Sequence, residues 1–497
     1  MGNLTSLSRL NLFPQSLVRD DEAEYGLANT ESGPRLAVWA SPTALRDFEG
    51  ECAEHDSQTL LLGPLTPRNA AALRAHHPWL RPRMLGLRTS AGMGDRLGLA
   101  TPGHVQAVRA AGGDLAPIFA QQSIREMTRT GRTPQQVMDD ATWGIFQGGW
   151  REGVGADADH QKTTADLDDC LAARFTFFTI DPGEHVDNSA ETASLADLRA
   201  AAENLPTEVQ PRAASLSGKS FDIEGDHILF DEHTLLKAAV KYGRAVAHVA
   251  TMHRHLMQKT GGENCELEVS VDETEQPTSH AEHVYIASEL RRLGVQWVSL
   301  APRYIGRFEK GVDYIGDLNA FERDFATHAA IARQLGPYKL SLHSGSDKFS
   351  VYAIAMRQTR GLVHLKTAGT SYLEALRTIA ALDPDFFHAI YAFARERYET
   401  DRASYHVSAQ LGRAPLPDEV ADRDLPQLLE QFDAREILHV TFGSVLTERT
   451  ADGRRSFYDP FVSLLRANAE AYAANLKSHF LRHLKPFASR IESHHES

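Results

Sequence analysis

Histidine, acidic and basic side chains gather at four places where an apolar run of the sequence gives way to polar residues. The four groups are Asp157, Asp159, His160 and Lys162; Glu266, Glu268, Ser270, Asp272 and Glu273; Arg303, Glu309, Lys310 and Asp313; and His343, Asp347, Lys348, His364 and Lys366. Imidazole and carboxylate together suit Zn²⁺, Mn²⁺ or a related divalent ion. If the fold brings these groups together, they predict a metal-assisted or acid–base site.

The stretch from Tyr338 to Phe349 places one of these histidines at the end of a predicted strand. Polar residues there alternate with two leucines, which is typical of a strand with one apolar face. The polar residues are Lys339, Ser341 and His343. The strand runs into the turn-forming sequence Ser344-Gly345-Ser346, as expected for a site at the carboxyl edge of a parallel sheet. The alternative is a histidine that only closes a strand.

A second strand carries acidic residues on one face. Its apolar positions are Leu267, Val269 and Val271, and this face is expected to turn toward helices. Glu266 and Glu268 would then point into the protein, where an unpaired charge is costly. Buried carboxylates need a cation or hydrogen-bond donors, which favours a functional role for at least one of them. Asp157, by contrast, is expected to be a solvated loop residue.

Strand and helix patterns alternate along the chain and indicate what positions these groups. Predicted strands cover residues 36–39, 60–63, 85–89, 117–121, 175–180, 267–271, 297–300, 339–343 and 362–366. One predicted helix begins at Thr101, and another follows the strand 117–121 and ends at about Asp140. Further helices begin at Ser279, run from about Leu318 to Leu335, and begin at Ser371. Alternation of this kind implies a parallel sheet. Seven or eight strands from residue 85 onward favour a (β/α)₈ barrel, with an open doubly wound sheet as the alternative.

The same patterns predict three regions. Residues 1–80 form an N-terminal extension or subdomain, residues 81–384 the catalytic barrel, and residues 385–497 a C-terminal helical region. Residues 186–260, rich in alanine and charge, are interpreted as a mostly helical insertion in the barrel. Apolar positions three and four residues apart in 461–484 predict helices that wrap the barrel or mediate self-association, so a homo-oligomer is one expected state.

Composition excludes several classes of partner. The formal net charge of −14 argues against nucleic acid and against anionic membrane surfaces. Three cysteines far apart in the 497 residues fit a reducing cytoplasm and no disulfide framework. No apolar run approaches the roughly 20 residues of a membrane span. Gly92, Gly94 and Gly98 are spaced unlike a dinucleotide-binding loop, so no nicotinamide cofactor is expected.

Several motifs resemble the tagaturonate epimerase family, in the same order and over roughly residues 85–410. They are Gly155–His160, Val271–Thr274, Ser299–Arg303, Phe308–Asp317, Leu340–Phe349 and Lys366–Thr370. That family is understood as bacterial metal-dependent enzymes that interconvert tagaturonate and fructuronate. The resemblance therefore implies a cytoplasmic enzyme with one divalent ion (Mn²⁺, Ni²⁺, Zn²⁺ or similar) and a small sugar acid as its substrate.

The implied reaction inverts C4 of a ketose whose ketone is C2. The C4 hydrogen is not acidic, which leaves a retro-aldol route or an enolate-first transfer of protons between carboxylates. On this reading the ion is held by His160, Glu309 and His343. The acid–base pair is Asp159 with a carboxylate of the 268–272 strand, either Glu268 or Asp272. The substrate is held by Lys348 and Lys366.

Other functions remain open at this point. A metal-dependent sugar aldolase or an aldose–ketose isomerase would use a similar barrel, and product analysis would separate them. A neutral ketohexose such as tagatose or fructose could replace the uronate. A non-catalytic sugar-binding regulator would bind sugar without turnover, and it leaves so many convergent carboxylates unexplained.

Overall fold

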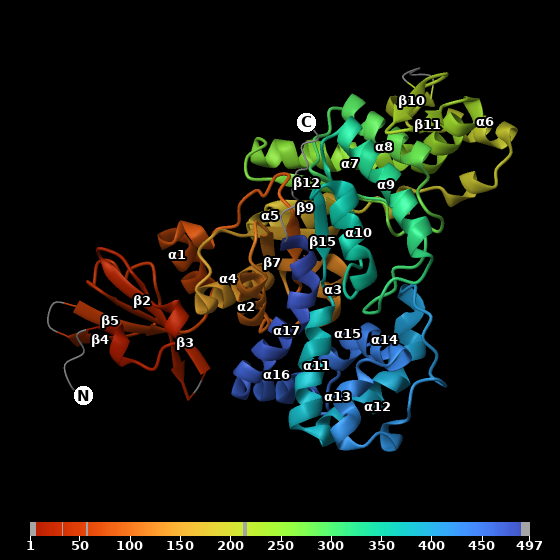
Figure 1. The fold of residues 1–497 in the computed structure, drawn as a ribbon. Coiled ribbons are helices and arrows are strands. Elements are labelled where there is room, and N and C mark those ends of the chain that lie inside the picture. Colours follow the sequence, from red (N-terminus) through yellow and green to blue (C-terminus); the bar gives the residue numbers. More distant parts are fainter. Residues whose placement is uncertain (1–5, 32, 56–57, 212–215, 489–497) are drawn as a thin grey trace, which may run out of the picture.

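The computed structural model describes residues 6–31, 33–55, 58–211 and 216–488, and its centre is a closed barrel of eight parallel strands (Figure 1). In chain order the strands are β6 (Ser90–Gly92), β7 (Ala116–Ser123), β8 (Gly155–Gln161), β9 (Phe177–Ile180), β12 (Glu266–Ser270), β13 (Ser299–Ala301), β14 (Lys339–Leu342) and β15 (Val363–Lys366). Pairing of β15 with β6 closes the ring. The predicted (β/α)₈ barrel is confirmed, and the open sheet is excluded.

Helices alternate with these strands on the outside of the barrel. They are α2 (Thr101–Ala111), α3 (Ile124–Thr130), α4 (Pro134–Gly148), α5 (Thr164–Ala172), α7 (Glu232–Thr260), α8 (His280–Arg292), α9 (Leu318–Leu335), α10 (Phe349–Thr359) and α11 (Thr370–Leu382). Helix α8 begins at the predicted capping box, in which Ser279 and Glu282 each bond the other's backbone N–H. Helix α9 has the predicted bounds.

The N-terminal region forms a separate antiparallel sheet beside the barrel (Figure 1). Its strands are β1 (Val18–Arg19), β2 (Ala23–Thr30), β3 (Gly33–Ala40), β4 (Glu51–His55) and β5 (Gln58–Gly63), in the order β1-β2-β3-β5-β4. Helix α1 (Pro67–His76) follows the sheet, and its residues pack against α4.

An insertion separates β9 from β12. It contains α6 (Leu195–Glu203) and the hairpin β10 (Ser220–Ile223) and β11 (Asp226–Leu229), and it continues into α7. The prediction of a mostly helical segment did not include this hairpin. Each strand of the hairpin has only four residues, too few for a period-two pattern to stand out.

The C-terminal region is helical and lies against one side of the barrel (Figure 1). Its helices are α12 (Pro384–Asp401), α13 (Leu425–Leu428), α14 (Phe432–Val440), α15 (Phe442–Thr447), α16 (Tyr458–Ala467) and α17 (Ala469–Ala488). Helix α17 packs on α2, α10 and α11, which accounts for its apolar face within one chain. Self-association and the predicted division into three domains stay predictions. None of the helices in the described parts of the chain is long and apolar enough to cross a membrane.

In the N-terminal sheet β1, β2 and β4 have no predicted counterpart, and in the barrel two strands differ clearly from the sequence-based expectation. The first barrel strand is Ser90–Gly92 and not 85–89, because the main chain turns at Gly86, where φ is +58°. Residues 155–161 form the full strand β8, for which no strand was predicted. Asp157 is therefore not a solvated loop residue but a fully buried side chain inside the barrel.

Candidate active site

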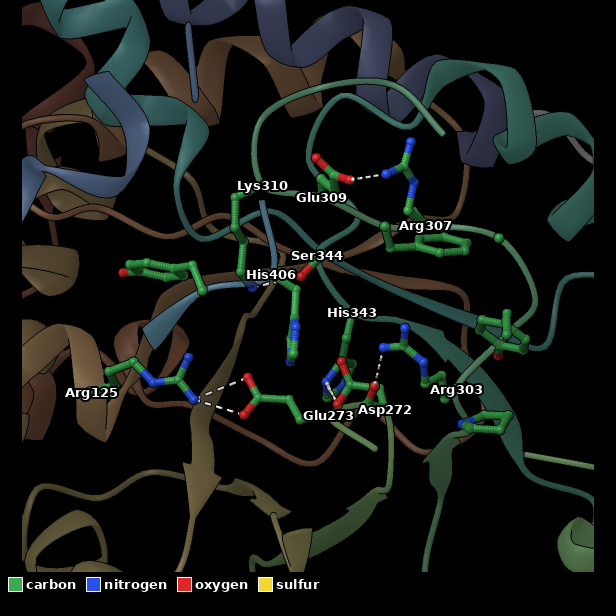
Figure 2. A pocket seen from close by; sticks show the side chains of 15 residues that line it. Arg125, Asp272, Glu273, Arg303, Arg307, Glu309, Lys310, His343, Ser344 and His406 are labelled. Carbon is green, nitrogen blue, oxygen red and sulfur yellow. Dashed lines mark hydrogen bonds and ion pairs between the residues drawn. The ribbon is translucent and has the colours of Figure 1, made fainter. Parts of the chain in front are cut away.

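Two adjoining cavities open at the carboxyl edge of the barrel, where the four predicted groups of polar residues meet. Their volumes are about 280 and 310 Å³. Both are lined by Arg125, Glu273, Lys310, His343, Ser344 and Tyr405. Figure 2 shows the first cavity, with His343 beside Asp272 and basic side chains around the rim. His343 thus lies between two halves of one site.

Two histidines and a carboxylate lie together on the wall of this site. The rings of His160 and His343 are 5.1 Å apart between centroids, nearly perpendicular to each other. One ligand atom each from Asp159, His160 and His343 lies within 4.8 Å of the others. The structure therefore brings together the side chains of His160 and His343, and Asp159 is the carboxylate beside them.

The local backbone explains how two successive residues, Asp159 and His160, reach this point. In a regular strand they would point to opposite faces. His160 instead has φ +51°, and the pairing of β8 with β9 shifts register between Ala158 and Gln161. A bulge of this kind re-aims side chains next to active sites. Nδ1 of His160 lies 3.2 Å from Asp181 Oδ2, which orients the ring.

His343, just past β14, is held by a carboxylate of β12 and another that follows it, two strands away in the barrel. Its Nε2 lies 2.7 Å from Glu268 Oε1, and its Nδ1 lies 3.4 Å from Asp272 Oδ1. Burial lowers the pKa of His343 and Lys366 lowers it further, but Asp272 and Glu268 outweigh both, so the net pKa is raised. Glu268 points into the barrel as predicted, and Asp272 lines the first cavity.

Lys366 forms the floor of the second cavity. Its Nζ lies 2.6 Å from Asp159, 2.9 Å from Glu268 and 3.0 Å from Asp157, and it is almost fully buried. Burial would raise the pKa of Asp159 and of Glu268, but the nearby ammonium and imidazoles hold both below their ordinary values. The floor is therefore a network of charged carboxylates around one cation.

Two residues predicted for the site have other partners. The carboxylate of Glu309 accepts hydrogen bonds from the N–H and the Oγ of Ser408 at 2.8 and 2.7 Å and lies 3.3 Å from Arg307. Figure 2 shows it turned toward Arg307 and away from His343. Lys348 donates to the carbonyls of Glu309 and Ser346 at 2.6 and 3.0 Å, and it lines neither cavity. The structure gives both residues a loop-anchoring role.

His364 behaves as a packed histidine. Its side chain is fully buried, and its Nδ1 lies 2.9 Å from Ser90 Oγ. Burial is the main cause that lowers its pKa, so the ring stays neutral.

Several cavity residues were not assigned from the sequence. Arg125 pairs with Glu273 at 2.7 Å across the cavity, and Tyr405 and His406 reach the rim from beyond the last barrel strand. Asp181, which contacts His160 but lines neither cavity, could have been found because it follows a predicted strand. For Arg125 and His406 the sequence holds no such signal, because they depend on how distant segments pack.

The donor set fits a divalent cation. Two imidazoles and a carboxylate are the ligand types that Zn²⁺ and related ions prefer. In addition, Oε2 of Glu268 is buried and has no hydrogen-bond partner within the described residues. A carboxylate oxygen left unpaired beside His343 indicates that a positive group belongs in the site.

Comparisons with known proteins agree with this geometry. The family model for tagaturonate epimerase matches residues 13–487. The tagaturonate/fructuronate epimerase of Thermotoga maritima is 44% identical over 475 residues, which cover 95% of this chain and 96% of the relative. Two crystal structures of the fructuronate-tagaturonate epimerase from Cohnella laeviribosi, one with glycerol and one native, superpose with TM-scores of 0.91 at 39% identity. They cover 97% and 96% of this chain, and the same shares of their own chains. This chain belongs to the tagaturonate epimerase family and is an isomerase.

Proposed function

We propose that this enzyme interconverts tagaturonate and fructuronate by inverting C4 of the ketose, with the help of one divalent ion. The observation that supports this most is the placement of His343 between two cavities, with Asp159 lining one and Asp272 the other. A reaction that inverts a hydroxyl carbon needs acid–base groups on two sides of that carbon. The names of the relatives supply the substrate pair.

His160, His343 and Asp159 would hold the ion. When bound, it would act as a Lewis acid that polarises the ketone oxygen and stabilises negative charge that develops beside it. Glu309, first expected as a ligand, is engaged by Ser408, so we propose Asp159 in its place.

The proton at the C4 hydroxyl would be taken and returned by Asp272. Burial raises its pKa, but His343 and the bond from Ser270 Oγ outweigh burial, so Asp272 is an ionised carboxylate at neutral pH and can accept a proton. Asp159 would face the opposite side. The variant Asp159→Asn distinguishes two roles of Asp159. It should lose bound metal if Asp159 is a ligand, and keep the metal if Asp159 is only a base.

In the retro-aldol route, loss of the C4 hydroxyl proton and cleavage of the C3–C4 bond together form an aldehyde at C4. The electron pair of the broken bond forms an enediolate over C2 and C3. The aldehyde turns its other face, the C3–C4 bond re-forms, and the new alkoxide takes back a proton. The C4 hydrogen never leaves carbon. In the enolate-first alternative, protons on carbon move between positioned carboxylates.

The rim of the cavity favours a sugar acid over a neutral sugar. Arg303 lines the first cavity, and its Nε is buried without a hydrogen-bond partner among the residues that the structure describes. Lys310 lines both cavities, and its Nζ donates to Ser344 Oγ at 2.6 Å. We propose that these cations bind the substrate carboxylate. Tagatose and fructose share C2 to C4 with the uronates and would react more slowly.

Product analysis tests the reaction. Metal-depleted protein is incubated with tagaturonate, with and without Mn²⁺, Ni²⁺ or Zn²⁺. Fructuronate should form only when metal is present, and nicotinamide cofactor should change nothing. Release of two three-carbon products would instead indicate an aldolase, and formation of an aldose would indicate an isomerase of another type. Saturable binding without turnover would indicate a sugar-binding regulator. Full turnover in stripped protein would remove the metal from the mechanism.

Two further measurements address mechanism and substrate. Epimerisation in D₂O should leave C4 protiated, and stoichiometric deuterium at C4 would contradict the retro-aldol route. Arg303→Gln should lower kcat/KM for tagaturonate by about 10- to 150-fold, the equivalent of one lost charge-assisted hydrogen bond. The same variant should leave kcat/KM for tagatose nearly unchanged, so an equal loss on both sugars would contradict carboxylate binding by Arg303.

A further inference from the structure

A second group of metal-ligand side chains lies outside the barrel, between α8 and α9, which pack side by side (Figure 1). His280 is the first residue of α8, and Asp324 and His328 are one turn apart on α9. One ligand atom from each lies within 4.8 Å of the other two. Residues four apart on a helix share a face, so Asp324 and His328 both point at the start of α8.

Two atoms of this group are buried without partners. Nε2 of His328 and Oδ2 of Asp324 are inaccessible to solvent, and neither has a hydrogen-bond partner in the described part of the chain. They lie 3.8 Å apart, and the His328 side chain is fully buried. Leaving a buried polar atom unsatisfied is costly, so two of them facing each other indicate a missing partner between them.

The opposite side of the His328 ring is already satisfied. Its Nδ1 lies 2.8 Å from Nδ1 of His283, and Nε2 of His283 lies 2.8 Å from the hydroxyl of Tyr338. If His328 carries its proton on Nδ1, it donates to His283, which in turn donates from Nε2 to Tyr338. This tautomer leaves the Nε2 lone pair of His328 free and aimed at Asp324. Histidines that bind metals are held in the same way, through the other ring nitrogen.

We propose that His280, Asp324 and His328 form a second divalent-cation site, selective for Zn²⁺, which joins α8 to α9. Two imidazoles and one carboxylate with a solvent-filled fourth position suit Zn²⁺. Ligand atoms about 2.1 Å from a tetrahedral ion are about 3.4 Å from each other. The distances of 3.1 Å from His280 Nε2 to Asp324 Oδ1 and 3.8 Å from His328 Nε2 to Asp324 Oδ2 lie on either side of this value.

Solvent reaches two of the three proposed ligands. His280 and Asp324 remain 32% and 18% exposed, which leaves an entry path for the ion.

The position of the site assigns it a structural role. The ring of His328 is 5.7 Å from the ring of Tyr304, which lines the first cavity. The Tyr304 hydroxyl donates to the carbonyl of Ser341 at 3.2 Å, two residues before His343. An ion between α8 and α9 would therefore stiffen the wall behind the catalytic cavity without touching the substrate.

Metal content tests the proposal on the full chain without a purification tag. Wild-type protein, Asp324→Asn and the control Glu322→Gln are loaded with Zn²⁺, freed of loose ion by gel filtration and analysed by mass spectrometry. Glu322 is a carboxylate on the same helix that pairs with Arg357 at 2.6 Å. We expect Asp324→Asn to carry one equivalent per chain less than wild type, and Glu322→Gln to lose none. The equivalent of zinc that His343→Ala loses should be a different one from the equivalent that Asp324→Asn loses.

Thermal melts supply the second readout. Melts of wild type and Asp324→Asn in chelator supply the two baselines, because Asp324 also lies 3.1 Å from His280 Nε2 without an ion. Added Zn²⁺ should raise the melting temperature of wild type and of His343→Ala, and this rise should be absent in His343→Ala combined with Asp324→Asn. Equal zinc content in wild type and Asp324→Asn, or an equal zinc-induced rise with and without Asp324, would mean that the cluster is only hydrogen-bonded and would overturn the proposal.

Discussion

Replacing Lys366 by methionine tests whether its ammonium group balances the carboxylates inside the barrel. The ammonium lies within 3.0 Å of oxygens of Asp157, Asp159 and Glu268, all buried. Methionine removes the charge and keeps a side chain of similar length. We expect the free energy of unfolding to fall by about 3–5 kcal/mol, because the substitution leaves buried charge without compensation.

Lys339 offers a matched control on the neighbouring strand. It is also fully buried in the barrel, but it donates to Ser90 Oγ at 3.0 Å and forms no ion pair within the residues that the structure describes. Burial lowers its pKa to about 8, so its charge is already weakly favoured there. Lys339→Met should therefore cost about 1 kcal/mol, the loss of one hydrogen bond.

The loss of stability in Lys366→Met should depend on pH in a direction that the pKa values fix. In wild type the pKa values of Asp159 and Glu268 are below their ordinary values, so their contribution to stability is present above about pH 4.5 and is lost as the pH falls through the folded-state values. Without Lys366, burial raises both pKa values, and the variant loses stability as the pH rises above about 4.5. The difference between the two proteins should therefore widen toward neutral pH.

Urea unfolding of chelator-treated protein, followed by tryptophan fluorescence, measures the effect. Titrations at about pH 5 and about pH 7.5 lie on either side of the expected change. Equal losses for Lys366→Met and Lys339→Met, or a loss that does not grow with pH, would refute the view that the charge network holds this site together.

Four further substitutions address the metal and the loops. His343→Ala should lose bound metal and turnover but keep its circular dichroism, whereas His364→Ala should keep the metal; the reverse result would place the ion on the other strand. Glu309→Gln should keep its metal content, because that carboxylate bonds Ser408, and metal loss would make Glu309 a ligand. Burial and the charge of Glu309 raise the pKa of Glu436 to about 8, so wild-type stability should fall between about pH 4.5 and 8. Glu436→Gln should flatten this slope in melts across that range, and an unchanged slope would assign it to another group.

The sequence predicted the barrel well but missed the strand that carries Asp159 and His160. That strand, β8, alternates alanine with aspartate, and aspartate is rare in strands because its charge is usually solvated. Here Ala156 and Ala158 are fully buried, and the aspartates are compensated by Lys366 of β15. The compensating residue lies far away in the chain, so no local pattern could show that these aspartates are buried.

The choice among candidate metal ligands also depends on packing that no local pattern shows. His343 ends a predicted strand, Glu309 lies in the loop beyond another, and no strand is predicted at His160, so strand-end position alone cannot rank them. Ser408 of the C-terminal region takes the carboxylate of Glu309. The bulge at His160 brings Asp159 to the same point as the two imidazoles. Both effects depend on packing between segments that sequence patterns treat separately.

The interior of this barrel links its stability to its chemistry. Barrels of this class are usually filled by layers of branched apolar side chains. Here the inward positions of β8, β12, β14 and β15 are polar or charged, and they continue from the cavity floor to the opposite end, where Glu266 accepts a bond from the N–H of Gly86. The carboxylates that the proposed reaction needs are therefore part of the core, and a change at one alters the electrostatics of the others. A variant here that loses turnover consequently requires a melt beside its kinetics before the loss can be assigned to chemistry.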